Sequence, residues 1–142
     1  MVYDTESVVF LHEEIARLFV DSTQRDQPID DWPDFDQFIN DWRTDDHPLV
    51  AFIEIEETVH TFALLSETEG NKYLIKALYS YPEARGRGAA TCILKRLLQE
   101  PCSLFAFVSR STKLLWEKAG FHDCGNRASE LIEVRSTRTA VE

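Results

Sequence analysis

Residues 80–90 have the sequence SYPEARGRGAA and stand between a stretch typical of a strand and a stretch typical of a helix. Gly86 and Gly88 let the backbone approach an anion closely, and the helix that follows directs unpaired N–H groups and the positive end of its dipole to the same place. Arg85 and Arg87 add positive charge. The segment therefore predicts a loop that binds a phosphate group within a ring of backbone amides.

The glycine spacing excludes two common kinds of phosphate-binding loop. A dinucleotide-binding fingerprint needs a third glycine at the position that Thr91 occupies. The Lys-Ser/Thr pair that ends the P-loop of nucleoside triphosphatases is also absent. Considered alone, the loop leaves open a second interpretation, a glycine-rich turn that only starts a helix.

The segments on both sides of the loop indicate a single mixed α/β domain over residues 1–142. Helical spacing of apolar residues predicts four helices, over about 6–20 and 33–43, from about 90 to the stop at Glu100-Pro101, and over about 111–119. Runs of β-branched, aromatic and other apolar residues predict five strands, over about 48–56, 58–66, 72–81, 103–108 and 131–135. The expected order is α-α-β-β-β-α-β-α-β, with the first two helices in 1–45 and an antiparallel meander in 46–81.

Composition narrows the class of protein further. The 142 residues are 44% hydrophobic and suit one compact domain, and no uncharged apolar run approaches the roughly 18 residues of a membrane span. Acidic residues stand near the N-terminus where a secretory signal would have bases, so we expect a soluble cytoplasmic protein. Three cysteines without a CxxC pair and four histidines without HExxH spacing predict neither a disulfide framework nor a metal site.

Charge divides unevenly along the chain. The total is −10, but residues 21–70 carry two bases and fourteen acids, whereas residues 71–142 carry twelve bases and seven acids. This division indicates an anionic ligand near the C-terminal half and a cationic one near the N-terminal half, with solubility as the competing explanation of the acids. Because the total charge would repel a duplex, we do not expect nucleic acid as a partner.

Two motifs together resemble the GCN5-related N-acetyltransferase (GNAT) superfamily. Arg85-Gly-Arg-Gly88-Ala-Ala90 matches the Arg/Gln-x-x-Gly-x-Gly/Ala motif of that family, with Pro82 at the usual place before it. Downstream, residues 109–121, SRSTKLLWEKAGF, are similar to the Asn…Tyr-Glu-Lys-x-Gly-Phe segment at the usual separation. The resemblance covers about residues 45–135, and residues 1–45 match only in arrangement.

The resemblance implies an acetyl-CoA-dependent N-acetyltransferase, a monomer or homodimer, in which residues 82–142 form the acyl-CoA-binding half. The strand that ends at Tyr81 and the strand 103–108 are expected to splay apart around the cofactor, and the acceptor amine attacks the thioester directly. The residues expected to bind acetyl-CoA are Leu78, Tyr79, Ser80, Tyr81, Arg85, Gly86, Arg87, Gly88, Ala89, Ala90, Ser109 and Trp116.

The sequence departs from the family pattern at the residues that move protons. Trp116 stands where the family commonly has a tyrosine that protonates the departing thiolate, and an indole N–H has no useful acidity. Lys72 stands near the position where several members carry a carboxylate base. These departures leave a second hypothesis open, a catalytically weak or inert protein of this fold used for binding or assembly, as in phage-borne proteins.

Four other residues are candidates for the proton-transfer steps. Tyr79 and Tyr81 stand near the expected thioester and are candidate proton donors, although tyrosines in strands usually serve in packing. Glu54, or its neighbour Glu56, is a candidate base acting through water, with a solvent-facing strand position as the alternative.

Overall fold

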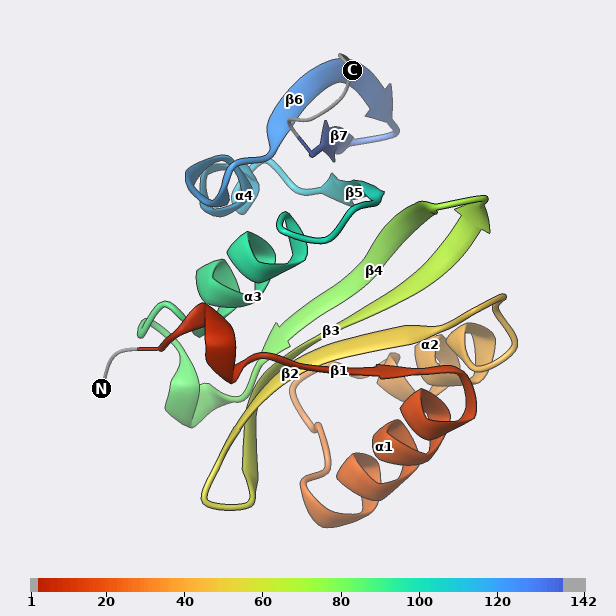
Figure 1. The fold of residues 1–142 in the computed structure, drawn as a ribbon, viewed down its shortest axis with the longest axis vertical. Helices are drawn as coiled ribbons and strands as arrows, with labels where there is room; N and C mark the ends of the chain where they lie inside the picture. The colour runs from red at the N-terminus through yellow and green to blue at the C-terminus, as the bar shows by residue number, and fades with distance from the viewer. Residues whose placement is uncertain (1–2, 137–142) are drawn as a thin grey trace.

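The computed structural model describes residues 3–136 and contains one mixed seven-stranded sheet (Figure 1). The strand order is β1-β2-β3-β4-β5-β7-β6; β4 and β5 are parallel, and the other neighbours are antiparallel. The strands are β1 (Val9–His12), β2 (Leu49–Ile55), β3 (Thr58–Glu69), β4 (Lys72–Ser80), β5 (Ser103–Val108), β6 (His122–Ala128) and β7 (Leu131–Arg135). The ends of the predicted domain, 1–2 and 137–142, lie outside the described residues.

Helices cover both faces of the sheet (Figure 1). Helices α1 (Glu13–Asp26) and α2 (Phe35–Trp42) pack on one face, and α3 (Ala89–Leu97) and α4 (Lys113–Ala119) lie on the other. Strand β2 contacts both layers, since Ala51 belongs to the α3 core and Val50 to the α1–α2 core. The predicted mixed α/β sheet is confirmed. Within residues 3–136, no helix is both long and apolar enough to cross a bilayer.

The predicted first helix is wrong in its bounds, because residues 6–20 contain a strand. A 3-10 turn (Thr5–Ser7) and β1 precede α1, which begins only at Glu13. The apolar run pairs with β2, with Val9 opposite Phe52 and His12 opposite Leu49. The shift places Ile15 of the predicted apolar stripe in solvent, 60% exposed, and Ala16 in the core.

A second strand is also missing from the predicted order. β6 has the sequence HDCGNRA, which lacks apolar alternation, and it forms because it pairs with β7 at the edge of the sheet. The observed order therefore adds β1 and β6 to the nine predicted elements. The predicted strands 103–108 and 131–135 match β5 and β7 in both bounds.

Strands β4 and β5 pair over a short stretch and then separate. Their register joins only Lys72–Leu74 to Ser103–Phe105. On its other side, β4 continues to pair with β3 as far as Ser80, with a bulge at Lys76 where Ile75 and Ala77 face successive residues of β3. In the part of the chain that the structure describes, the second half of β4 therefore pairs with no strand on the β5 side.

Candidate functional site

A cleft of about 300 Å³ lies between the separated halves of β4 and β5. Its walls come from these two strands, from the start of α3, and from α4 with the loop before it. The lining residues are Ile75, Lys76, Ala77, Leu78, Ala90, Ala106, Phe107, Val108, Ser109, Thr112, Leu115 and Trp116. The lining is mostly apolar, which is typical of a small-molecule site.

The strand edges give the cleft its polar groups. Beyond Leu74 and Phe105 the two strands no longer pair with each other, so backbone N–H and C=O groups on these edges lack the ladder partner that a closed sheet would provide. A ligand with amide groups along its length can take that place. Backbone polar groups near an apolar wall favour such an extended, amide-containing ligand.

The loop before α3 lies at one end of the cleft and is built to approach an anion. Gly86 and Gly88 have φ of +77° and +87°, and a Cβ at either would project into open space. Gly88 is the N-cap of α3, no side chain within residues 3–136 caps the helix, and its first turn carries no acidic residue. The first N–H groups of α3 therefore keep their hydrogen-bonding capacity for a ligand, which fits a pyrophosphate group.

The two loop arginines have different surroundings. Arg87 is exposed, consistent with a phosphate contact. Arg85 turns to the α1–α2 connection: its guanidinium forms an ion pair with Asp31 at 2.6 Å and donates from Nε to the Ser80 carbonyl at 2.8 Å. It also lies over the Tyr79 ring. Through the ion pair with Asp31, Arg85 connects the loop 80–90 to the N-terminal half of the chain.

Both candidate tyrosines point away from the cleft. Tyr79 donates its hydroxyl hydrogen to Asp31 at 2.6 Å, and Tyr81 donates to the Gln27 carbonyl at 2.8 Å. Burial and the Asp31 carboxylate raise the pKa of Tyr79, and burial raises the pKa of Tyr81 to about 12. The hydrogen bond from Tyr79 and the Arg85 guanidinium hold the pKa of Asp31 below its usual range. The two hydroxyls thus hydrogen-bond the end of β4 to the α1–α2 connection.

Some of the remaining predicted residues line the cleft, and the others lie outside it. Leu78, Ala90, Ser109 and Trp116 line the cleft, and Ala89 is buried at the start of α3. Trp116 is 6% exposed and packs edge-on against Phe121 with ring centroids 5.3 Å apart. Ser80 binds the Thr61 hydroxyl at 2.9 Å. Glu54 is exposed on β2, opposite Val59, and is not among the cleft-lining residues.

Two residues that the sequence did not single out complete the site. Asp31 joins Tyr79 and Arg85, and it was one of many acids in the segment 21–70, so its type and spacing gave no signal. Among the cleft-lining residues that the structure describes, Lys76 alone is ionisable, and its ammonium group is bound to Asp45 at 2.7 Å. The bulge of β4 places Lys76 there, and a bulge is invisible in the local sequence pattern.

Solved structures resemble this chain closely in fold and distantly in sequence. A protein assigned to the GNAT family of acetyltransferases in Desulfovibrio desulfuricans is 16% identical, with a TM-score of 0.62 over 90% of this chain and 97% of its own. Tetrahymena GCN5 is 14% identical, with a TM-score of 0.61 over 89% and 95% of the two chains. An IAA acetyltransferase from Bacillus cereus is 15% identical, with a TM-score of 0.61 over 92% and 99%.

The sequence comparisons return no match: no family model and no curated protein matches this chain. The structural likeness extends over nearly the whole of the neighbours as well as of this chain. The sheet order, the separation of β4 from β5 and the glycine loop before α3 agree with it. The chain therefore has the fold of the GCN5-related N-acetyltransferases.

Proposed function

We propose that this protein is an N-acetyltransferase that transfers the acetyl group of acetyl-CoA to an amine in a ternary complex. One observation carries the proposal: the cleft between β4 and β5 has the uncapped start of α3 and its left-handed glycines at one end. An apolar cleft with free strand edges and an anion-binding loop suits a molecule that has a pyrophosphate at one end and an amide-containing arm.

The proposed binding roles follow the geometry. The backbone amides from Gly86 to Ala90 bind the pyrophosphate, and Arg87 supplies charge beside them. Leu78 and its neighbours on β4 hydrogen-bond the pantetheine arm through the backbone, and Ser109 and Trp116 form the facing wall. Acetyl-CoA supplies an acetyl group activated as a thioester. A β4 N–H beyond Leu74 is the proposed donor to its carbonyl oxygen, where charge develops.

The acceptor is proposed to be a cationic amine, because the α1–α2 side of β4 is acidic. Residues 21–70 carry a net charge of −12, and Asp31 and Asp45 approach β4 from that side. Transfer requires the amine nitrogen to lose one proton and the departing sulfur to gain one. Tyr79 and Tyr81 as donors and Glu54 as a base stay predictions for these steps.

A second function, cofactor binding with little or no turnover, is favoured by the side chains at the cleft. Trp116 offers no acidic proton, and the hydroxyls of Tyr79 and Tyr81 are held by Asp31 and Gln27. Among the described lining residues the ionisable side chain is Lys76, which Asp45 binds. Such a protein would use the fold for binding or assembly.

The decisive experiment separates binding from turnover. Acetyl-CoA and CoA should raise the melting temperature, since a ligand at about 100 times its Kd stabilises the native state by about 2.7 kcal/mol. Release of free CoA thiol is then measured with polyamines, aminoglycosides, amino acids and peptides as acceptors. An unchanged melting temperature at millimolar acetyl-CoA overturns cofactor binding. A clear thermal shift without turnover across the panel supports the second function instead.

A further inference from the structure

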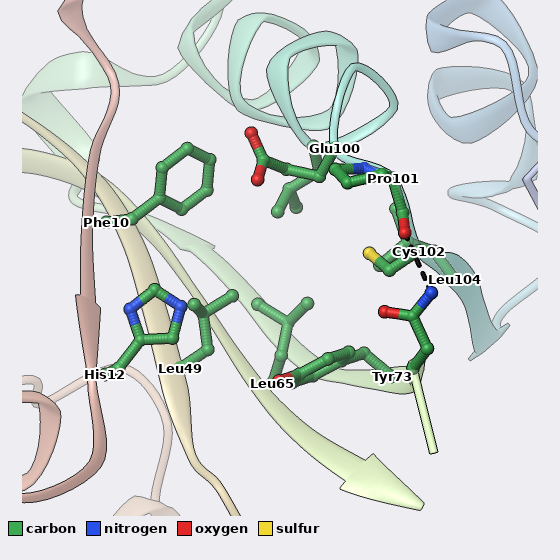
Figure 2. Close-up of a pocket in the computed structure, with 11 residues that line it drawn as sticks. Phe10, His12, Leu49, Leu65, Tyr73, Glu100, Pro101, Cys102 and Leu104 are labelled. Carbon is green, nitrogen blue, oxygen red and sulfur yellow. Dashed lines mark hydrogen bonds between the residues drawn. The ribbon is translucent and has the colours of Figure 1, made fainter. Parts of the chain in front are cut away.

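Whereas the cleft borders Ile75 to Leu78, a second cavity lies near the start of β4, at Tyr73. It has a volume of about 200 Å³ and opens between β1, the paired start of β4 and β5, and the connection from α3 to β5 (Figure 2). Tyr73 and Leu104 line it and face each other in the parallel pair, one residue before β4 and β5 separate. No cleft-lining residue belongs to this cavity, so the two sites are distinct.

The floor of the cavity is apolar. It is made by four buried leucines, from β2, β3, α3 and β5: Leu49, Leu65, Leu97 and Leu104. The Phe10 ring stands over it from β1 in Figure 2. An apolar cavity of about 150 Å³ is large enough to hold benzene. This cavity therefore has room for one aromatic ring and a short substituent.

Polar side chains gather at the rim. Figure 2 shows the Glu100 carboxylate, the His12 imidazole and the Cys102 sulfur around the opening. Arg96 binds Oε2 of Glu100 at 2.5 Å, and its guanidinium lies over the Phe10 ring at 4.7 Å. Oε1 of Glu100 accepts no hydrogen bond from the described residues, which leaves an acceptor for a ligand at the rim.

The electrostatic potential at this end favours a cation. Burial raises the pKa of the Tyr73 hydroxyl, and the carboxylates of Glu67 and Glu13 raise it further. The same two carboxylates, Glu13 before Glu67, raise the pKa of the neighbouring His47. Glu13 and Glu67 are themselves paired with His47, as Glu100 is with Arg96, so three carboxylates stand against two basic side chains in these pairs. An anionic ligand would meet these carboxylates, whereas an ammonium group would be attracted to them.

We propose that this cavity binds a small organic amine, with an aromatic or compact apolar body on the leucine floor and its ammonium group at Glu100. The site is separate from the proposed acceptor position beside the cleft, and it does not depend on acyl transfer. Its occupant would contact Tyr73 and Leu104, which are paired where β4 and β5 are still joined.

The test uses three ligands of one size and shape, namely benzylamine, benzyl alcohol and benzoate, each titrated into the ¹⁵N-labelled protein. Benzylamine should shift the amides of Tyr73 and Leu104 in a saturable way and leave those of Leu78 and Ala90 in place. Benzyl alcohol should bind several-fold more weakly, and benzoate should produce no shift. Equal binding of amine and alcohol overturns the role of charge. Shifts confined to Leu78 and Ala90, or no shifts, overturn the site.

Two variants locate the binding. Glu100→Gln should weaken benzylamine binding about fivefold, as expected for a partly exposed ion pair, whereas Glu56→Gln, an equal charge change on a remote hairpin, should not. Cys102→Leu fills the opening and should abolish binding. In both cavity variants the thermal shift by acetyl-CoA should be unchanged, so failure of this site and failure of the proposed function are distinguishable. Unaltered benzylamine binding in a folded Cys102→Leu protein contradicts the proposal.

Discussion

Strand β4 presents two very different environments. Its edge toward β5 borders the apolar cleft, where Leu78 faces Trp116 and Ser109 across the gap. Its face toward α1 and α2 carries Tyr79 and Tyr81, whose hydroxyls bind Asp31 and the Gln27 carbonyl. Unpaired strand edges and apolar side chains dominate the first environment, and side-chain hydrogen bonds dominate the second.

Because of this difference, the groups proposed to bind the cofactor and the side chains proposed to transfer protons lie on different sides of β4. Cofactor binding in the proposed function needs mainly backbone amides and an open edge, which the cleft provides. Proton transfer needs an acidic or basic side chain at the reacting atoms, and the candidate donors Tyr79 and Tyr81 lie on the other face of β4. The two environments meet at Arg85, which belongs to the loop 80–90 and is paired with Asp31 on the opposite side.

The largest effect is expected where the loop approaches the cofactor. Gly88→Val places a β-branched side chain at φ +87°, a backbone conformation that costs about 1–2 kcal/mol for such a residue. The altered backbone and added methyl groups should weaken acetyl-CoA binding at least tenfold, measured by calorimetry. Gly70→Ala, in the β3–β4 turn with open space around its Cβ, is the control and should bind normally. Normal binding by the valine variant would remove this loop from the site.

The next-largest effect is expected on turnover in variants of Trp116, which test whether the cleft lacks only a proton donor. Trp116→Tyr introduces a phenol into the cleft wall, and a positioned general acid contributes about 10²–10⁴-fold to rate. We expect turnover to rise at least tenfold in this variant and to stay unchanged in Trp116→Phe, which makes a similar cavity without the hydroxyl. Equal rates in the two variants would mean that the tryptophan is not what limits the chemistry.

A smaller effect is expected on the tyrosine face. Tyr79→Phe removes the hydrogen bond to Asp31 and should lower stability by about 1 kcal/mol, because Asp31 is exposed and water can replace the hydroxyl. Acetyl-CoA affinity should change by less than about threefold, and so should kcat. A fall in kcat of about 100-fold at unchanged KM would instead identify Tyr79 as the proton donor that the sequence predicted.

The sequence predicted the loop 80–90 and the strand 103–108 well because their features are local. The loop 80–90 carries its own conformational requirements, and the strand 103–108 is a compact apolar run between two breaks. Gly86 and Gly88 adopt the left-handed backbone that their type allows. Neighbouring residues alone determine these features, so a single sequence contains the information.

The parts that were missed depend on distant contacts. Residues 8–12 fit both a helical stripe and a strand, and pairing with β2, about forty residues away in the chain, decides for the strand. The polar β6 exists only through β7. The partnership of Asp31 with Tyr79 and Arg85 joins residues about fifty positions apart, and many acids nearby have the same local pattern.

The smallest effect is expected on the pH dependence of the melting temperature, and it involves residues of the N-terminal half alone. The Glu13 carboxylate, and then Glu67, raise the pKa of His47 in the folded protein. The ion pairs of His47 therefore stabilise the fold fully below the ordinary histidine pKa of about 6.5. This stabilisation is lost as the pH rises through the raised pKa. His47→Asn should therefore lower the melting temperature at pH 6 by more than at pH 9. His122→Asn, at the start of β6, controls for loss of a histidine elsewhere. Because His47 lies apart from the cleft, the thermal shift by acetyl-CoA should be the same in His47→Asn and the parent protein at each pH; a reduced shift would mean that the two halves are coupled.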